Sequence, residues 1–269
     1  MGLSSDAFEI SNEKAVKTAS FHEMDEPMSI GILIDTSSSM QEPELQEFAR
    51  PKPIAEAVAY FLKLGNPANE YFFIAFDKTT KLLADWQSGK SPPSAENTSP
   101  GERGFTVLYD ACLAALDKLK QAHHSKQALL IFSDGLDSKS QHRFAELRRA
   151  VERNDVLVYA IAPRGVAYPT GLKAVILGMQ DREAHAVLGE LAEITGGFVY
   201  YPETRQQLEV AAERIAIEMR HQYRFAFQPD DARIAGKSYH LKVQVKPPPG
   251  APAQYQNVRV RTRRAYFAP

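Results

Sequence analysis

Short apolar runs alternate with amphipathic stretches through the middle of the chain. The apolar runs predict buried β-strands at residues 28–34, 71–76, 81–86, 127–132, 156–162 and 198–201. Continuous runs of this kind are typical of strands covered on both faces of a sheet. Apolar residues at helical spacing predict α-helices between them, at residues 54–62, 108–119, 144–151, 188–192 and 208–219. The alternation indicates strand–helix units around a largely parallel sheet, which is an α/β fold.

Local signals refine this pattern. Thr204 and Gln207 have the spacing of a capping box, so we expect the last long helix to begin just after Thr204. Gly196 and Gly197 follow the preceding helix, as is common after a helix C-terminus. Residues 88–104 are rich in Ser, Pro and Gly and predict a surface loop. Residues 164–182 form an insertion for which the sequence indicates no particular structure.

The C-terminal part has a different pattern. Residues 223–227, 238–245 and 256–263 alternate apolar and polar positions, which predicts antiparallel strands with one solvated face. Since a lone hairpin is marginal in water, these strands need a partner, and residues 8–21 are the available candidate. We therefore predict an N-terminal β segment at 1–26, an α/β domain at 27–222, and a C-terminal β segment at 223–269 that packs with the first.

The net charge also changes near the start of the C-terminal strands. The formal net charge of −1 is a cancellation, because the residues from 232 onward contain eight basic residues and no acid. The first 231 residues hold 24 basic and 33 acidic residues, and so carry −9. This shift in composition supports a boundary near the start of the C-terminal strands.

Composition excludes some classes of protein. Hydrophobic residues make up 44% of the 269 residues and charged residues 24%, which is close to the globular average. No apolar run approaches the roughly 18 residues that a membrane helix needs. The first residues have neither the basic nor the apolar region of a secretory signal. Cys112 is the single cysteine and lies on an apolar helix face, so a disulfide within the chain and a cysteine-based zinc site are excluded.

Three short polar segments carry the candidate chemistry. Asp35, Ser37 and Ser39 directly follow the first core strand, Thr106 lies at a helix start, and Asp134 follows the strand at 127–132. Oxygen-only ligation suits a hard cation such as Mg²⁺. Taken alone, the first segment fits a plain turn or helix cap equally well. All three, however, lie at the ends of predicted elements where ligands of open α/β sheets assemble.

These segments resemble the metal ion-dependent adhesion site of the von Willebrand factor A domain family. The match comprises Asp-x-Ser-x-Ser at Asp35, Ser37 and Ser39, together with Thr106 and Asp134. The resemblance implies a Rossmann-like doubly wound sheet with helices on both faces and a divalent cation, Mg²⁺ or else Mn²⁺ or Ca²⁺. It also implies that the serines and threonine coordinate the metal, and that the aspartates act directly or through water. One open position would take a carboxylate from a protein partner.

A narrower resemblance covers nearly the whole chain. Residues 21–40, 191–197 and 261–266 are similar to a bacterial subgroup often called VWFA-related and abundant in Acidobacteria. Two positions depart from its usual pattern, Ser38 and Ala265, where the family often has glycine. Members of the subgroup are usually exported, so we expect a periplasmic or extracellular protein whose leader is absent from this chain. Otherwise the protein would be cytoplasmic.

An enzyme is the first alternative, of the metal-dependent phosphoryl or ester hydrolase type. Asp35 lacks the second carboxylate two residues on that an aspartyl phosphotransferase needs, since position 37 is serine. The chain also has no G-x-S-x-G nucleophile elbow. We therefore predict an interaction module that is not an enzyme.

The basic C-terminal strand is the second alternative. Arg259, Arg261 and Arg263 would share one strand face, and could bind nucleic acid or an anionic surface. The sequence shows no aromatic platform beside them. We favour an exposed face whose like charges discourage edge-to-edge pairing, and no nucleic-acid partner. The sequence does not indicate the oligomeric state.

Overall fold

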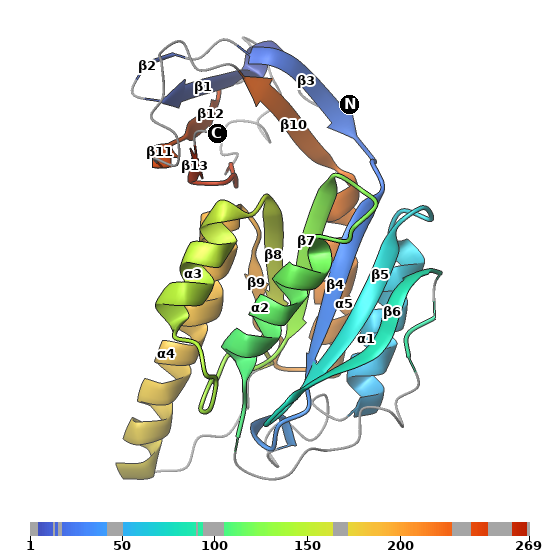
Figure 1. Cartoon of the computed structure of the whole chain (residues 1–269), viewed down its shortest axis with the longest axis vertical. Helices are drawn as coiled ribbons and strands as arrows, with labels where there is room; N and C mark the ends of the chain where they lie inside the picture. The colour runs from blue at the N-terminus through green and yellow to red at the C-terminus, as the bar shows by residue number, and fades with distance from the viewer. Residues whose placement is uncertain are drawn as a thin grey trace.

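The computed structural model describes residues 5–12, 14–15, 18–41, 51–89, 91–93, 105–163, 172–227, 238–246 and 260–267. Its centre is a six-stranded sheet in the spatial order β6-β5-β4-β7-β8-β9 (Figure 1). The strands are β4 (Met28–Asp35), β5 (Glu70–Phe76), β6 (Thr80–Ser88), β7 (Lys126–Phe132), β8 (Val156–Ile161) and β9 (Val199–Tyr200). All neighbouring pairs are parallel except β5 and β6, which are antiparallel.

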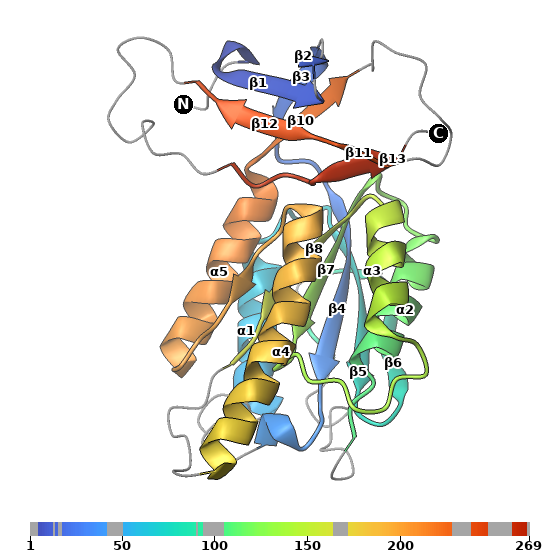
Figure 2. The same ribbon diagram turned by 90° about the vertical axis from the view of Figure 1, so that its left-hand side faces the viewer.

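Helices cover both faces of this sheet, as the sequence predicts (Figures 1 and 2). They are α1 (Pro51–Leu64), α2 (Leu108–Leu119), α3 (Phe144–Arg153), α4 (Leu172–Thr195) and α5 (Arg205–Arg220). One apolar core lies between the sheet and α1 and α5, and a second between the sheet and α2, α3 and α4. All eight residues of β4 are buried, because this strand is central and covered on both sides. No helix in the described ranges is long and apolar enough to cross a membrane.

The order of strands reverses between β4 and β7. From β4 the chain moves to β5 and β6 on one side, and then returns through α2 to β7 on the other side. The loops that follow β4 and β7 therefore leave the same edge of the sheet in opposite directions. Ligands of open α/β sheets bind at this switch point. Asp35 ends β4, and Asp134 follows β7 by two residues.

The predicted β appendage from both termini is present. β1 (Phe8–Asn12) pairs with β12 (Lys242–Val245) and with β2 (Lys14–Ala15). β3 (Thr18–Met24) pairs with β10 (Gln222–Phe227), and β11 (Ser238–His240) pairs with β13 (Ala265–Phe267). Figures 1 and 2 show these strands gathered at the end of the central sheet where β4 begins. The appendage therefore lies opposite the switch point.

Several boundaries differ from those that the sequence predicts. The stretch at 238–245 is divided at Leu241, because β11 and β12 pair with different strands. Residues 172–182 of the insertion at 164–182 are helical, since α4 begins at Leu172, while 164–171 lie outside the described residues. Most of the loop predicted at 88–104 also lies outside them. The capping box is only half formed, because Thr204 accepts from the Gln207 N–H but the Gln207 side chain accepts from Glu203.

The prediction for the C-terminal arginines was wrong. Residues 260–264 are not a strand, and β13 starts only at Ala265. Arg263 donates to the backbone oxygens of Asn154 at 2.7 Å and Val151 at 3.4 Å, at the end of α3. Arg261 pairs with Glu218 of α5, and Arg264 with Glu193 of α4. These side chains attach the C-terminal segment to the helices instead of lining an exposed face; Arg259 lies outside the described residues.

Gly196 shows how closely this segment passes. Its φ of +87° lies in the left-handed region, and its N–H bonds to the Ala192 oxygen at the end of α4. A Cβ built on Gly196 would lie 2.7 Å from the carbonyl carbon of Thr262. Glycine is therefore required here both by the backbone and by the approach of the C-terminal segment.

Candidate functional site

Asp35 is a buried carboxylate at the carboxyl end of β4. Only 2% of the surface of this residue is exposed. Oδ1 accepts from the backbone N–H of Ser37 at 2.9 Å, and Oδ2 accepts from the hydroxyl of Ser133 at 2.6 Å. Neither donor carries a charge. The protein therefore holds this carboxyl group in a fixed position with dipoles, and neither of these donors supplies a positive charge that would neutralise it.

The two serines of the same loop lie side by side. The hydroxyl oxygens of Ser37 and Ser39 are 3.0 Å apart. Ser37 is 1% exposed, whereas Ser39 is half-buried and begins the short 3₁₀ helix η2 (Ser39–Gln41). The turn after β4 thus brings the Asp35, Ser37 and Ser39 oxygens into one cluster, as their spacing predicts.

Asp134 reaches this cluster from the neighbouring strand. Its Oδ1 accepts from the Leu136 N–H at 2.9 Å, while the Ser133 hydroxyl accepts from the Gly135 N–H at 3.0 Å. The pKa of Asp35 is raised to about 7, mainly by burial and in addition by the negative charge of Asp134. Two carboxylates therefore share the switch point closely enough for one to oppose ionisation of the other.

Thr106 is brought to the same edge through backbone hydrogen bonds. Thr36 donates to the Phe76 oxygen at 2.9 Å, and Val107 donates to the Asp77 oxygen at 2.8 Å. These two bonds join the loop after β4 to the end of β5, and the end of β5 to the start of α2. Thr106 itself is 5% exposed, and its N–H donates to the Ser138 hydroxyl at 2.9 Å, in the loop after Asp134.

The start of α2 is capped by the loop after β7. No side chain caps the helix at its own N-cap residue, Val107. Instead the Tyr109 N–H donates to Asp137 at 3.1 Å, and the Asp110 N–H donates to the Ser140 hydroxyl at 3.1 Å. The first N–H groups of a helix have no acceptor within the helix, and here residues distant in the sequence accept from them. The segments that contain Thr106 and Asp134 are therefore held together.

The donor set can be compared with what metal ions prefer. Within the described ranges, no three His, Cys, Asp or Glu side chains come together in a way that could hold a metal. A cation at this edge would therefore need hydroxyl ligands as well, and Ser37, Ser39 and Thr106 are the candidates. Two carboxylates with neutral hydroxyls form an oxygen-only set that fits Mg²⁺, which keeps several waters and uses one or two carboxylates. The raised pKa of Asp35 agrees, because a cation would relieve the cost of its buried charge.

Sequence reasoning missed several supporting residues. Ser133 binds Asp35 directly and is fully buried, and Asp137, Ser138 and Ser140 hold the start of α2. Ser133 precedes Asp134 at the end of a predicted strand, which is a signal that could have been used. The other three are polar residues of a loop, and nothing in their spacing identifies the distant backbone groups that they bind.

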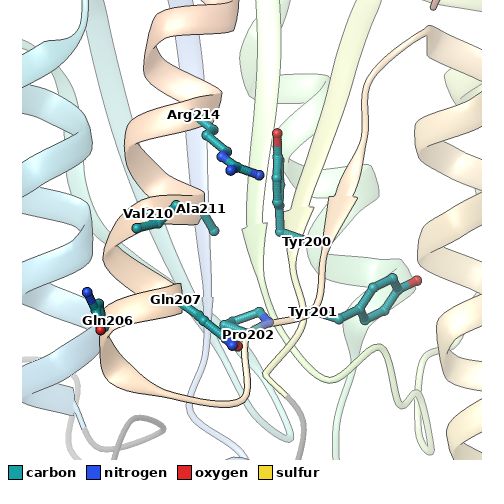
Figure 3. Close-up of a pocket in the computed structure, with 8 residues that line it drawn as sticks. All are labelled: Tyr200, Tyr201, Pro202, Gln206, Gln207, Val210, Ala211 and Arg214. Atoms are coloured by element: carbon teal, nitrogen blue, oxygen red, sulfur yellow. The ribbon is translucent and has the colours of Figure 1, made fainter. Parts of the chain in front are cut away.

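A groove of about 320 Å³ lies elsewhere, between β9 and α5 (Figure 3). Tyr200, Tyr201 and Pro202 line one side, and Gln207, Val210 and Arg214 belong to the helix side. None of the five predicted site residues lines it. The groove is thus separate from the oxygen cluster at the switch point.

Fold and site together define a doubly wound α/β domain with an oxygen-lined cluster at its switch point. The family model for the von Willebrand factor type A domain matches residues 29–214, which is well over half of the chain. The chain therefore belongs to the von Willebrand factor type A domain family, and the resemblance drawn from its motifs is confirmed. No curated protein matches the chain. Membership of the narrower bacterial subgroup stays a prediction.

Solved structures with the same fold come from varied proteins. An aerotolerance-related membrane protein from Bacteroides fragilis NCTC 9343, with multiple mutations to serines, has a TM-score of 0.53 at 16% identity, over 72% of this chain and 98% of that one. A von Willebrand factor type A structure from Catenulispora acidiphila has a TM-score of 0.53 and 14% sequence identity, over 80% of this chain and 49% of that one. The pilus adhesin SpaC from Lactobacillus rhamnosus GG, in an open conformation, has a TM-score of 0.54 and 12% sequence identity, over 80% of this chain and 34% of that one.

At these identities the likeness shows the fold alone. This chain also spans only about half of the matched Catenulispora chain and about a third of the adhesin.

Proposed function

We propose that this protein is a non-enzymatic, metal-ion-dependent interaction module. Asp35, Ser37, Ser39, Thr106 and Asp134 would hold Mg²⁺, or Mn²⁺ or Ca²⁺ in its place, and the cation would accept a carboxylate from a protein partner. The observation that carries the proposal is the convergence of three separate segments at the switch point, with a buried Asp35 whose pKa is raised partly by Asp134. Family membership supports the interaction role.

The roles of the residues follow from their positions. Asp35 and Asp134 supply the negative charge that attracts the cation, and the three hydroxyls supply neutral oxygen ligands. Ser133 orients Asp35 through its 2.6 Å hydrogen bond, and so acts as a positioning residue. When bound, the cation supplies a Lewis-acidic position for an anionic oxygen. The two carboxylates would at most balance the two positive charges of the cation, and a coordination position left to water could take a carboxylate oxygen from the partner.

Calorimetric titration with Mg²⁺ and Mn²⁺ tests the cation site. We expect the wild type to bind, and Asp134→Ala to lose at least about ten-fold in affinity because half of the negative charge is gone. Asp117→Ala is the matched control, since Asp117 lies at the far end of α2 and is largely exposed. Equal binding by wild type and Asp134→Ala would show that the site assignment is wrong.

An affinity capture of partners, with Mg²⁺ and with chelator, tests the interaction. We expect a partner that is retained only with the cation, and lost with Asp134→Ala. Turnover of a phosphate or ester substrate that depends on Asp35 would instead favour the hydrolase alternative and contradict the non-enzymatic assignment.

A further inference from the structure

An exposed aromatic ring and a lysine lie at the rim of the candidate metal site. Phe105 directly precedes Thr106, and 44% of its surface is exposed. The Lys139 ammonium lies 4.0 Å from the centre of the Phe105 ring. The Lys139 backbone N–H donates to the Thr106 oxygen at 3.1 Å. Both residues are therefore attached to Thr106, one through the chain and one through a hydrogen bond.

The Lys139 charge is held by the ring, not by an acid. Lys139 is in none of the ion pairs formed between described residues, whereas Lys118, Lys120 and Lys246 each pair with a carboxylate. A cation over an aromatic face is attracted by the ring quadrupole, which fixes its position without neutralising it. An ammonium group with its full charge thus stands at the edge of a site that contains two carboxylates.

The ring and the ammonium present an apolar face and a positive charge at one point of the surface. Aromatic residues are enriched where proteins bind one another. The Lys139 ammonium lies over this ring, and none of the ion pairs among the described residues contains it. Its charge is therefore available to an incoming group.

We propose that Phe105 and Lys139 form a second recognition subsite for the same partner, one that takes a second carboxylate from an acidic protein segment. The inference rests on the proposed function: one carboxylate of the segment binds the cation, and a neighbouring carboxylate pairs with Lys139. The methylene groups of that second acidic side chain pack on the exposed Phe105 ring. The module therefore selects segments with two nearby acidic residues over segments with one.

Synthetic peptides test this directly. One peptide carries a single Asp in a Gly/Ser background, and a series carries a second Asp one, two or three residues away. Binding is measured by NMR titration of the full chain with saturating Mg²⁺ at low ionic strength. For the wild type we expect at least one two-Asp peptide to bind about two- to five-fold more tightly than the single-Asp peptide, and added salt to reduce the difference.

Three variants locate the effect. Lys139→Ala should remove the advantage of the second Asp, and Lys139→Glu should reverse it. Lys120→Ala is the matched control, because Lys120 is an exposed lysine at the far end of α2, and it should keep the wild-type preference. Mg²⁺ affinity should stay within about two-fold of wild type in Lys139→Ala and Lys120→Ala, which shows that both variants are folded.

The outcomes separate this inference from the proposed function. If Mg²⁺ binds and the single-Asp peptide binds, but no second Asp improves affinity in a Lys139-dependent way, the second subsite is wrong and the proposed function stands. If Mg²⁺ binds but no peptide in the series does, carboxylate capture is wrong and the inference fails with it. If wild type does not bind Mg²⁺, both are wrong.

Discussion

The two ends of the central sheet handle charge in opposite ways. At the carboxyl end, Asp35 and Asp134 are like charges beside each other, and the described donors to Asp35 are neutral. At the opposite end, Arg220 donates to Asp25 at 2.6 and 2.8 Å, and Arg263 donates to the last carbonyls of α3. At the carboxyl end, repulsion between two like charges remains, and an added cation could relieve it. At the opposite end, the charged side chains are paired with groups of the chain itself. Perturbed pKa values cluster at functional sites, which supports the carboxyl end as the candidate site.

The largest expected effect concerns pH at the carboxyl end. The pKa of Asp35 in the folded protein is about 7, above its ordinary value of 3.8, so the folded state binds this proton more tightly than the unfolded state. The stability that this contributes is complete below the unfolded value and is lost as pH rises through about 7. We expect cation-free protein to lose up to about 4 kcal/mol over this range relative to Asp35→Asn, which has no such proton.

Urea denaturation of both proteins in chelator, at a series of pH values, measures this difference. Saturating Mg²⁺ should stabilise the wild type most at high pH and leave Asp35→Asn nearly unchanged, because a ligand that binds only the folded state stabilises it. Parallel pH profiles for the two proteins would contradict the contrast between the two ends.

The next effect tests how the C-terminal segment is attached. Arg263→Ala should cost about 2–3 kcal/mol, because it leaves carbonyl groups at the end of α3 without their charged donor. Arg264→Ala is the matched control: its ion pair with Glu193 has both side chains more than half exposed, and we expect a loss below about 1 kcal/mol. Urea denaturation gives both values. Equal losses would mean that Arg263 is only another surface charge, and a changed Mg²⁺ affinity would mean that the two ends are not independent.

The smallest effect concerns Arg220. Its hydrogen bond to Asp25 holds the pKa of that carboxyl below the ordinary 3.8, so the pair contributes stability above that value and loses it as pH falls further. Both side chains are about one-third exposed, which limits the pair to about 0.5–1 kcal/mol. We expect Arg220→Ala to show this loss near neutral pH, with the Asp25 pKa rising toward 3.8 in an NMR titration. An unchanged Asp25 pKa would contradict it.

The sequence predicted the central domain well because its signals are local. Apolar runs long enough to be buried on both faces identified β4, β5, β7 and β8 within one residue at every end. Periodic apolar positions identified the helices, although α4 extends far before the stripe at 188–192 because its first half falls in a segment without a clear pattern. The strand predicted at 198–201 is present as β9, which is only two residues long, so its bounds could not be defined by periodicity.

The residues of the candidate site could be predicted because their signals are also local. Asp35, Ser37, Ser39, Thr106 and Asp134 each lie beside the end of an element, so their meeting at one edge follows from the topology of a parallel sheet. Metal binding by these residues stays a prediction. The supporting bonds, such as Ser133 to Asp35 and Asp137 to Tyr109, join residues about 30 to 100 positions apart. Polar loop residues have many possible partners, and their spacing selects none of them.

The sequence by itself therefore determined the alternation of strands and helices, the presence of strands at both termini, and the residues of the candidate site. Each depends on hydrophobic periodicity or on position next to an element end. Only the tertiary structure decided that the C-terminal arginines attach to α3, α4 and α5, that β11 and β12 separate at Leu241, and that Asp35 is buried beside Asp134. These features depend on which carbonyl, carboxylate or strand edge lies nearby after folding. The charges and the apolar–polar alternation along the chain do not specify which distant groups come together.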